Sequence, residues 1–550
     1  MFKIENFGWP ARMEFLRLVF FIGVSFSWSP VASQVLPLSN SLAEDTSANA
    51  ADPAPAETSE LASAAAAPAI VLISNQKTRS SVSVAQSEIK KILPGTNPLK
   101  ALHSLPGVSF QTADPWGNNE QNLALFVHGF SGQQLGYTLD GVPLGDQQYG
   151  NYNGLSPQRA IISENLRSVL LSSGAGDLAT ASTSNLGGTI ETFSSDPLSQ
   201  RGTSLAQTIG SHSATRSFVR FDSGNSGNLA TDSAFYIALL RQKARAWDFD
   251  ALQGGTQVNA KLINHSERGK LTLFFNYSDK TEPNEDSTVH VAGEISSPYT
   301  RPFTYPDFSG ALAYLSASGA TPAVDGANYR NYFGVAQRTD YLSYAKYELD
   351  LNAETSWINQ VYFHHDDGLG AVAGPIVVAG LPALFRVYFP QQDLKQVFGG
   401  SGYAVRSTEY WIKRAGLIST VRSAWGKHQI ELGGWLEHNR SSAYRRWYQL
   451  DVKQPLTPYD RPKNPVITQY GSEIDNHVVQ LHAQDDWRPL PSLTVQAGFK
   501  SSLQFADGQF PAQPALGAIS GGSTALPVGE IITKAWLLPQ LGLIWNLPSK

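Results

Sequence analysis

The chain has 550 residues with a formal net charge of -5; only 16% are charged, 11% are aromatic and 47 are glycine. This length allows two or more domains, since one domain typically takes roughly 100–200 residues. Soluble globular chains average about 25% charged residues. The acidic balance excludes a nucleic-acid partner, which needs clustered lysine and arginine. The absence of cysteine excludes disulfides, thiolate metal sites and thiol nucleophiles.

The N-terminus has the pattern of an export signal. Arg12 and Arg17 precede an apolar run at residues 18–28, and the compact residues Val31 and Ser33 follow it. This pattern predicts a signal peptide over residues 1–33, cleaved after Ser33. The apolar run is too short to cross a bilayer core of ~30 Å, and no later segment supplies ~20 unbroken apolar residues. Any membrane insertion is therefore expected to use a β-barrel.

A tether is expected over residues 34–74. Residues 38–68 are almost all Ala, Ser, Pro, Glu, Asp and Thr, and such a segment buries too little apolar area to order itself. The tether ends in a short β-branched run: Ile70, Val71, Leu72, Ile73 and Ser74. Two interpretations stay open for this run. It is either the first strand of the next domain or a segment that pairs with a periplasmic partner.

Residues 75–198 read as a compact α+β domain. Asn97 followed by Pro98 predicts a helix start, and Pro106 with Gly107 ends that helix. A second short helix is expected after Ser156 and Pro157. Strands are expected at 123–127, 137–139, 166–171 and 188–193.

The sequence pattern changes at residue 199. Residues 199–550 predict strands with alternating apolar and polar residues and show no pattern of a helix start. At 271–277, 479–484 and 493–499, apolar and polar side chains alternate with period two. A soluble β-sandwich and a membrane barrel share this pattern within one strand. Aromatic residues near strand ends favour the barrel, since they form interface girdles there. These aromatics are Trp357, Tyr362, Phe363, Trp435 and Trp487. The tight turn at 491–492 and the long irregular loops expected at 282–339 and 369–406 also fit a barrel.

The motifs of residues 75–198 resemble the plug of TonB-dependent outer-membrane receptors over nearly its full length. The matching segments are Leu105-Pro106-Gly107-Val108, Leu125 to Phe130 with His128 and Gly129, Tyr137 to Leu144 with Asp140, Gly141, Val142 and Pro143, Glu164 to Val169, and Asn185 to Ile190 with Gly187 and Gly188. Further on, Gln484 to Trp487 with Leu493 resembles a barrel strand pair of the family.

The departures concern two family arginines. His128 stands where the family usually has Arg, and Ser172-Ser173-Gly174 stands where Arg-Gly-Pro is common. In the family those arginines are thought to brace the plug against acidic residues of the barrel. Imidazole does not replace a guanidinium fork, so the resemblance does not carry those contacts over to this chain.

The resemblance implies a membrane all-β fold: a large antiparallel transmembrane barrel, of 22 strands in the family, with an N-terminal α+β plug. It implies a receptor, not an enzyme, in the outer membrane of a Gram-negative bacterium. The expected partners are TonB of the inner-membrane energising complex, outer-membrane lipid and a small-molecule ligand, most readily an iron chelate. No cofactor is implied. Residues 70–74 would couple to TonB by β-pairing.

Several alternatives stay open beside this reading. The ligand could instead be cobalamin, a carbohydrate or another metal complex, since the family carries all of these. A passive porin and a secreted β-sandwich enzyme or lectin are the other classes. The sequence shows no motif of a Ser-His-Asp catalytic triad. The glycines at 174–176 predict a turn rather than a phosphate-binding loop.

Two further groups of side chains are candidate binding features. The run from His364 to Asp367 could bind a metal, but strand neighbours point to opposite faces, so a loop-rim cluster is the favoured interpretation. Six loop aromatics could stack on a ligand or pack one loop on another: Tyr299, Phe303, Tyr305, Tyr329, Tyr332 and Phe333.

The barrel is expected to be incomplete in this chain. At ~10 residues per strand, 22 strands need about 220 residues before any loops. In residues 199–550, this would leave roughly six residues for each connection between strands. The two predicted long loops, at 282–339 and 369–406, are each many times longer than six residues. Only about fourteen alternating segments can be placed, and residues 546–550 lack an aromatic terminal strand.

Overall fold

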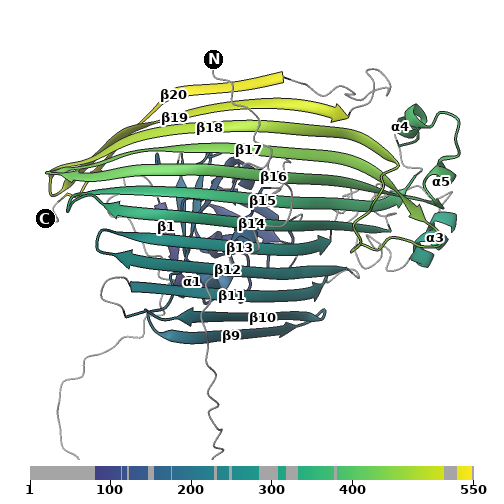
Figure 1. The fold of residues 1–550 in the computed structure, drawn as a ribbon, viewed down its shortest axis with the longest axis horizontal. Helices are drawn as coiled ribbons and strands as arrows, with labels where there is room; N and C mark the ends of the chain where they lie inside the picture. The colour runs from purple at the N-terminus through teal and green to yellow at the C-terminus, as the bar shows by residue number, and fades with distance from the viewer. Residues whose placement is uncertain are drawn as a thin grey trace, which may run out of the picture. The chain divides into compact units, whose positions relative to one another are not determined.

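The computed structural model describes residues 81–112, 114, 116–120, 123–145, 154–174, 176–227, 232–246, 251–283, 308–317, 332–376, 381–512 and 529–547. Most of these residues are in β-strands (Figure 1). No helix among them has the length and apolarity needed to span a membrane.

The first part of the described chain, β1 to β8, is the region predicted as a plug. It has a five-stranded sheet in the order β1-β7-β8-β5-β6 and a three-stranded sheet in the order β2-β3-β4. Its strands are β1 (Ser81–Ala85), β2 (Val108–Thr112), β3 (Leu123–Val127), β4 (Phe130–Ser131), β5 (Gly136–Leu139), β6 (Val142–Pro143), β7 (Leu166–Ser173) and β8 (Gly188–Ser194). Its helices are α1 (Gln86–Ile89), α2 (Pro157–Ala160) and the 3-10 turns η1 (Pro98–Ser104), η3 (Gly132–Gln134) and η4 (Ser163–Asn165). We call β1 to β8 with these helices the plug.

The predicted helix start at Asn97 is confirmed. Its side-chain oxygen accepts a hydrogen bond of 2.9 Å from the Leu99 backbone N–H, and Pro98 takes the first helical position. This arrangement satisfies a backbone donor that a helix start otherwise leaves unpaired. Leu99 and Leu102, from the same turn, are 1% and 0% exposed in the plug core.

The second part is one antiparallel sheet of twelve strands, β9 to β20, each paired with its neighbours in chain order. We call this sheet the wall. Its strands are β9 (Arg201–Gly210), β10 (Ala214–Ser223), β11 (Asp232–Arg245), β12 (Leu252–Ser266), β13 (Gly269–Pro283), β14 (Phe333–Asp350), β15 (Thr355–Pro375), β16 (Gly400–Trp425), β17 (His428–Asp451), β18 (Ile467–Leu490), β19 (Leu493–Ala512) and β20 (Gly529–Trp545).

Within the part of the chain that the structure describes, three helices accompany the wall: α3 (Phe308–Ala317), α4 (Leu381–Tyr388) and α5 (Leu394–Val397). The expectation that helix starts cease after residue 199 is therefore wrong. All three helices lie in the long connections, where no sheet partner fixes an extended backbone (Figure 1).

The wall strands are longer than predicted, because they extend into segments that the sequence analysis predicted to be loops. Residues 369–375 continue β15, and β16 begins at Gly400, inside the connection predicted to run from 369 to 406. β16, β17 and β18 have 26, 24 and 24 residues. Where about fourteen alternating segments were expected, the described residues form twelve wall strands.

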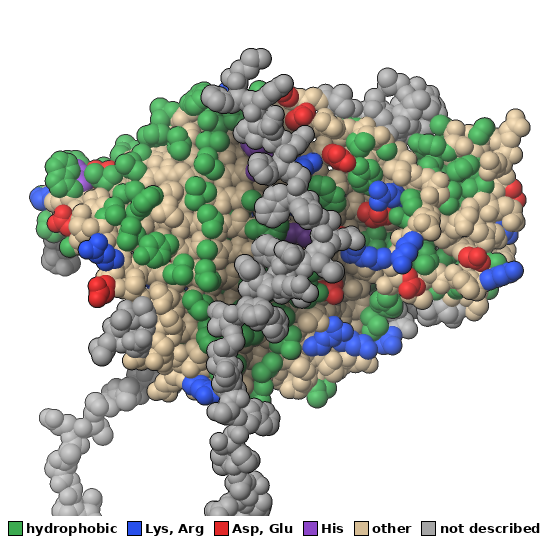
Figure 2. Space-filling model, in the orientation of Figure 1, with side chains coloured by type: hydrophobic (Ala, Val, Ile, Leu, Met, Phe, Trp, Pro, Cys, Tyr) green, Lys and Arg blue, Asp and Glu red, His purple; other side chains and the backbone are tan. Residues whose placement is uncertain are grey.

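Alternation along each wall strand separates two faces. On β17, Trp435 and Glu437 are buried against the plug, whereas Leu432 and Leu436 are 52% and 47% exposed on the opposite face. We call the face that contacts the plug the inner face, and its opposite the outer face. Figure 2 shows hydrophobic side chains gathered over broad areas of the surface. The alternation on β17 is the period-two pattern predicted from the sequence.

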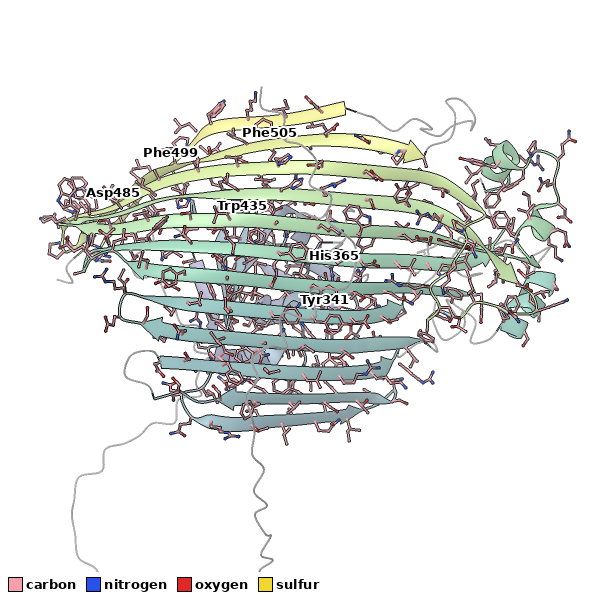
Figure 3. The ribbon with its side chains drawn as sticks, viewed as in Figure 1. Tyr341, His365, Trp435, Asp485, Phe499 and Phe505 are labelled. Carbon is pink, nitrogen blue, oxygen red and sulfur yellow. The ribbon has the colours of Figure 1, made fainter. Side chains whose placement is uncertain are left out.

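Aromatic side chains mark two heights on the outer face. At the ends of β16 to β18, Trp425 and Trp487 flank His428, and the rings of His428 and Trp487 stack at 5.9 Å. Farther along the strands, Tyr341 of β14 lies opposite His365 of β15, and their rings stack at 6.3 Å (Figure 3). Exposed apolar residues such as Leu417, Leu436 and Leu481 lie between these heights.

Candidate functional site: the buried contact between plug and wall

The plug core continues directly into the inner face of the wall. The core cluster of the plug includes six wall residues: Phe274, Leu342, Tyr344, Tyr362, Trp435 and Val478. Apolar burial of this kind is non-directional, so specificity must come from the polar contacts between the two parts.

Arg159 is the centre of those polar contacts. It lies in α2 and is 0% exposed. Its Nε donates to both Glu120 oxygens at 3.1 and 3.2 Å, and Nη1 donates to Asp340 of β14. Nη1 also lies 3.6 Å from Asp366 of β15. One guanidinium therefore joins a plug carboxylate to two carboxylates of the wall.

Strand pairing places the two wall carboxylates side by side. Asp340 and Asp366 are directly opposite in the β14–β15 register, and both are 0% exposed on the inner face. His364, two residues before Asp366, shares that face and its Nε2 lies 3.2 Å from Asp340. Among the described residues, neither oxygen of Asp366 has a hydrogen-bond partner.

Glu120 extends the cluster to a second arginine. Its carboxylate accepts from Gln158 at 2.7 Å and from Ser156, and lies 3.6 Å from Arg338 of β14. Arg338 in turn donates to Glu282 of β13. Burial raises the pKa of Glu120, but the nearby Arg159 and Arg338 outweigh it and hold that pKa below its ordinary value.

Amide side chains of the wall form hydrogen bonds with the plug backbone at and after Arg159. Asn276 donates to the Arg159 carbonyl at 2.9 Å, and Gln257 donates to the same oxygen at 3.1 Å. Asn259 accepts from the Ile162 N–H at 2.9 Å. The α2 segment is thus held through both its side chain and its main chain.

The motif around Asp140 forms a second polar contact. Asp140 has a φ of +52°, and Gly141 after it has a φ of +91°. The Asp140 carboxylate accepts from the Ser194 N–H at 2.9 Å and from the Tyr344 hydroxyl at 2.7 Å. Gln360 donates to the Asp140 carbonyl at 3.3 Å. The turn therefore connects β5, β8 and two wall strands.

The end of the same motif contacts a wall arginine. Arg414 of β16 donates to the Pro143 carbonyl at 2.9 Å and to Glu437 at 3.0 and 2.6 Å. Val142 is 0% exposed beside it. Glu437 also accepts from Tyr362, whose oxygen accepts from Trp435 at 2.8 Å.

Of the remaining plug motifs, Glu164 accepts hydrogen bonds from Arg216 of β10 in the wall, whereas the motifs around Gly107 and Gly187 make contacts within the plug. Gly107 has a φ of +75°, and its carbonyl accepts from the His128 N–H at 2.8 Å. Leu105 is buried, whereas Pro106, Val108 and Gly129 are at least partly exposed. The Gly187 N–H donates to the Gln134 carbonyl at 2.9 Å, and Gly188 has a φ of +123°.

The two positions that lack the family arginine do not brace the plug by a charge. His128 is exposed, and Ser172 is buried within the plug sheet opposite Ser81. Arg159 instead makes the ionic contact to the wall, together with wall cations that bond to the plug, such as Lys500, whose Nζ donates to the Thr180 carbonyl at 3.1 Å. Sequence reasoning missed Arg159 and Glu120.

The run from His364 to Asp367 is not a loop-rim cluster, and that expectation is wrong. It lies inside β15. The alternation argument holds, because His364 points to the inner face while His365 points to the outer face and stacks on Tyr341. The run therefore does not present both imidazoles to one ion.

Two of the six candidate loop aromatics are described, and both are packed. Tyr332 and Phe333 are 7% and 5% exposed in a cluster with α3, where Phe308 lies 5.2 Å from Tyr332. Tyr299, Phe303, Tyr305 and Tyr329 lie outside the described residues, as does the candidate coupling segment at 70–74.

Residues 74–189 match the family model described as TonB-dependent Receptor Plug Domain. The chain contains a TonB-dependent receptor plug. Its sheets, its Asp140 turn and the plug members of the buried cluster, Arg159 and Glu120, lie in or next to the matched range. No curated protein matches the sequence.

Solved receptor structures share the fold of the plug and wall together. The ferric-catecholate import receptor Fiu from E. coli K12 superposes with a TM-score of 0.53 at 15% identity over 85% of this chain and 66% of that one. The ferric yersiniabactin uptake receptor FyuA from Yersinia pestis gives 0.52 at 11% identity, over 85% and 61%. The siderophore receptor PiuA from Acinetobacter baumannii gives 0.53 at 14% identity, over 86% and 62%. This chain thus spans about three fifths to two thirds of their length.

Proposed function

We propose that this chain belongs to a TonB-dependent receptor that takes up a scarce ligand, an iron–siderophore complex, across the outer membrane of a Gram-negative bacterium. The observation that carries the proposal is the plug match over residues 74–189, in a domain whose charged side chains bond to the inner face of an antiparallel wall.

The outer face of the wall supports placement in a membrane. On β18 the outward rings of Trp487 and His477 are ten residues apart in sequence. Ten residues of strand span about 33 Å, and a tilt of about 40° reduces this to about 25 Å of height, the height of the apolar band in outer-membrane barrels. Val479, Leu481 and Ala483 are the outward apolar residues between them.

An iron chelate is proposed as the ligand because structurally similar proteins are receptors for iron chelates. Fiu is a ferric-catecholate import receptor, FyuA is a ferric yersiniabactin uptake receptor and PiuA is a siderophore receptor. Receptors of the same family for cobalamin, a carbohydrate or another metal complex are the alternative. A passive porin is disfavoured, because a plug bonded to the wall through Arg159 would obstruct free diffusion.

Coupling to TonB is assigned to Ile70, Val71, Leu72, Ile73 and Ser74, a β-branched run after a tether with few apolar residues larger than alanine. Pairing with a partner strand would use main-chain hydrogen bonds. Export would precede this, with the signal peptide of residues 1–33 removed.

The test is uptake of iron-55 delivered as catecholate, hydroxamate and citrate chelates by a receptor-deleted strain carrying the gene. Ile73→Pro removes a backbone donor and should abolish uptake while leaving chelate binding unchanged. Ala64→Pro, in the preceding tether, is the matched control and should have no effect.

Normal uptake by Ile73→Pro would contradict the coupling assignment, and loss of binding as well would make the segment a plug strand. Uptake of none of the chelates, with growth on an alternative carbon source instead, would contradict the iron assignment.

A further inference from the structure

A histidine pair on the outer face of the wall has no role in the contact between plug and wall. His438 of β17 and His477 of β18 are directly opposite in the strand register. Their side chains are 48% and 58% exposed, and both belong to the outward-pointing sets of their strands. The two imidazole rings stack in parallel, with centroids 4.5 Å apart and an interplanar angle of 5°.

Both imidazoles direct the same nitrogen at one carboxylate. His438 Nε2 lies 2.9 Å from Asp475 Oδ1, and His477 Nε2 lies 3.1 Å from the same oxygen. The three ligand atoms lie within 4.8 Å of one another. Cross-strand pairing fixes the spacing of the two rings, and Asp475 is two residues before His477, so it lies on the same face.

These separations suit a first-row divalent ion. With metal–nitrogen and metal–oxygen bonds of about 2.0–2.2 Å, neighbouring donors in tetrahedral or octahedral geometry lie about 3.0–3.4 Å apart. The two imidazole–carboxylate distances of 2.9 and 3.1 Å need changes of only a few tenths of an ångström. Two imidazoles with one carboxylate favour Zn²⁺, Cu²⁺ or Ni²⁺ over Mg²⁺ or Ca²⁺, which prefer oxygen ligands only.

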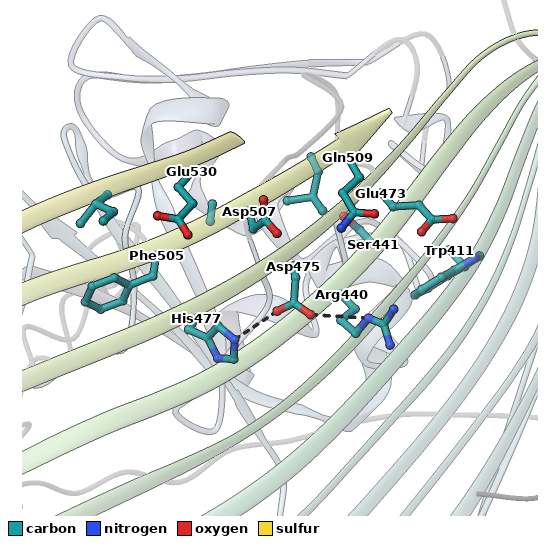
Figure 4. A pocket seen from close by; sticks show the side chains of 13 residues that line it. Trp411, Arg440, Ser441, Glu473, Asp475, His477, Phe505, Asp507, Gln509 and Glu530 are labelled. Atoms are coloured by element: carbon teal, nitrogen blue, oxygen red, sulfur yellow. Dashed lines mark ion pairs between the residues drawn. The ribbon is translucent and has the colours of Figure 1, made fainter. Parts of the chain in front are cut away.

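The surroundings orient the carboxylate and favour a cation. Arg440 Nε lies 3.6 Å from Asp475 Oδ2, the oxygen that faces away from the imidazoles (Figure 4). His477 and Asp475 line a hollow of about 410 Å³. The charged residues that line the hollow are Arg440, Glu473, Asp475, Asp507 and Glu530. Four carboxylates against one guanidinium give this surface an excess of three negative charges, which raises the local concentration of cations.

We propose that His438, Asp475 and His477 bind one divalent transition-metal ion on the outer face of the wall. Three protein ligands leave at least one coordination position of the ion open. That position faces the hollow, so a water molecule or an anionic oxygen from outside the protein completes the coordination. The site is separate from the buried Arg159 cluster and does not depend on the ligand that the receptor takes up.

The first test titrates the full chain, purified in detergent, with Zn²⁺ in a calorimeter. The wild type should bind one saturable equivalent. His438→Asn and His477→Asn should each weaken binding by at least the roughly 10–100-fold that loss of an outer-shell partner costs a metal site. Both side chains are about half exposed, so far-UV circular dichroism should be unchanged.

His428→Asn is the matched control. His428 lies on the same strand as His438 and pairs with one carboxylate, Asp485, at 2.7 Å, with comparable exposure. It has no second histidine opposite it, because its register partner is Trp487. This variant should bind Zn²⁺ as the wild type does.

A second measurement counts nitrogen ligands. Cu²⁺ bound to the wild type should show electron paramagnetic resonance couplings to two imidazole nitrogens, and to one in His438→Asn. The proposal is overturned if the wild type binds no more Zn²⁺ than the His438→Asn/His477→Asn double variant, or if His428→Asn removes the binding. A hydrogen-bonded His–Asp–His group without metal affinity would give the first of these results.

Discussion

Arg159 of the plug donates a hydrogen bond to Asp340 of the wall, and neither side chain is exposed to solvent. The two residues are 181 positions apart in the chain. A buried charge of this kind is tolerated only when it is paired, so the contact fixes one position of α2 against β14. Each of the first three predictions concerns this cluster.

Arg159→Ala should release the plug from the wall. Breaking a buried ion pair by removing one partner costs about 3–5 kcal/mol. Here Asp340 and Asp366 lose their arginine, while Glu120 keeps Arg338 at 3.6 Å. Arg167→Ala is the matched control, because Arg167 is 55% exposed and lies 4.0 Å from Asp196, and exposed pairs contribute at most about 1 kcal/mol. Hydrogen–deuterium exchange should accelerate through β5 to β8 in Arg159→Ala alone. Equal exchange in the two variants would refute the central role of Arg159.

Substitution of Asp340 and of Asp366 by asparagine should have different effects on the free energy of unfolding. Asp340 accepts bonds from Arg159, whereas Asp366 has no hydrogen-bond partner among the described residues. Asp340→Asn should therefore cost about 3–5 kcal/mol. Asp366→Asn removes a like charge beside Asp340 and should leave the free energy of unfolding unchanged or raise it. Urea unfolding followed by tryptophan fluorescence compares them. A larger loss in Asp366→Asn would show that the two roles are reversed.

Acid should weaken the cluster through Glu120. Its folded-state pKa lies below the ordinary value of 4.5, because Arg159 and Arg338 outweigh burial. A depressed pKa contributes stability that is fully present above the unfolded pKa and is lost as the pH falls through the folded one. The urea midpoint of the wild type should therefore fall below about pH 4.5. Glu120→Gln should start lower at neutral pH and fall less, and parallel pH curves would contradict this.

Gly188→Ala should prevent the plug from folding. Gly188 has a φ of +123°, and an added Cβ would overlap the Ser172 carbonyl oxygen of the neighbouring strand. Backbone strain of this kind costs roughly 1–3 kcal/mol before the steric overlap is counted. Gly202→Ala in β9 is the control, since a Cβ there meets nothing within 4 Å. Protease resistance of the plug should be lost only in Gly188→Ala; a resistant plug in that variant would mean that β7 and β8 can separate locally.

A lysine in the apolar band should hinder insertion. Leu481 of β18 is 53% exposed between the two aromatic heights, and Leu481→Lys should cost about 2–4 kcal/mol in a bilayer. Val452 is 46% exposed but lies just past the end of β17, so Val452→Lys should insert like the wild type. Folding yield in phosphatidylcholine vesicles measures the difference. Equal yields would place the band elsewhere on the wall.

The sequence predicted local features well where the cause is local. The Asn97 helix start depends on one side chain and its own turn, and the Asp140–Gly141 turn depends on φ angles that few residues adopt. The opposite orientation of His364 and His365 follows from strand alternation alone. The plug match at 74–189 falls on the motifs that carried the resemblance.

The ionic contact was not predictable in the same way. Its members Arg159, Asp340 and Asp366 come together only through the β14–β15 register and the seating of α2, which are tertiary facts. One signal was present: Arg159 borders the buried run Ala160, Ile161 and Ile162 in a charge-poor chain. A charge in such a place requires a buried partner. Strand ends were misplaced because Gly and Pro at 370–375 were taken as breaks, although β15 pairs through them.

Strand length has a consequence for the uptake function proposed above. On β18, residues 467–477 continue beyond His477, away from the Trp487 end. Ten residues add about 33 Å of strand, or about 25 Å of height at a tilt near 40°. Encounter with a ligand would then begin far above the lipid surface, on the rim of the wall. Trp447 pairs with Ile467 at this far end of β17 and β18. Under the proposed function, substitutions near Trp447 should change how fast ligand is captured, while those near Arg159 should change how fast it is released inward.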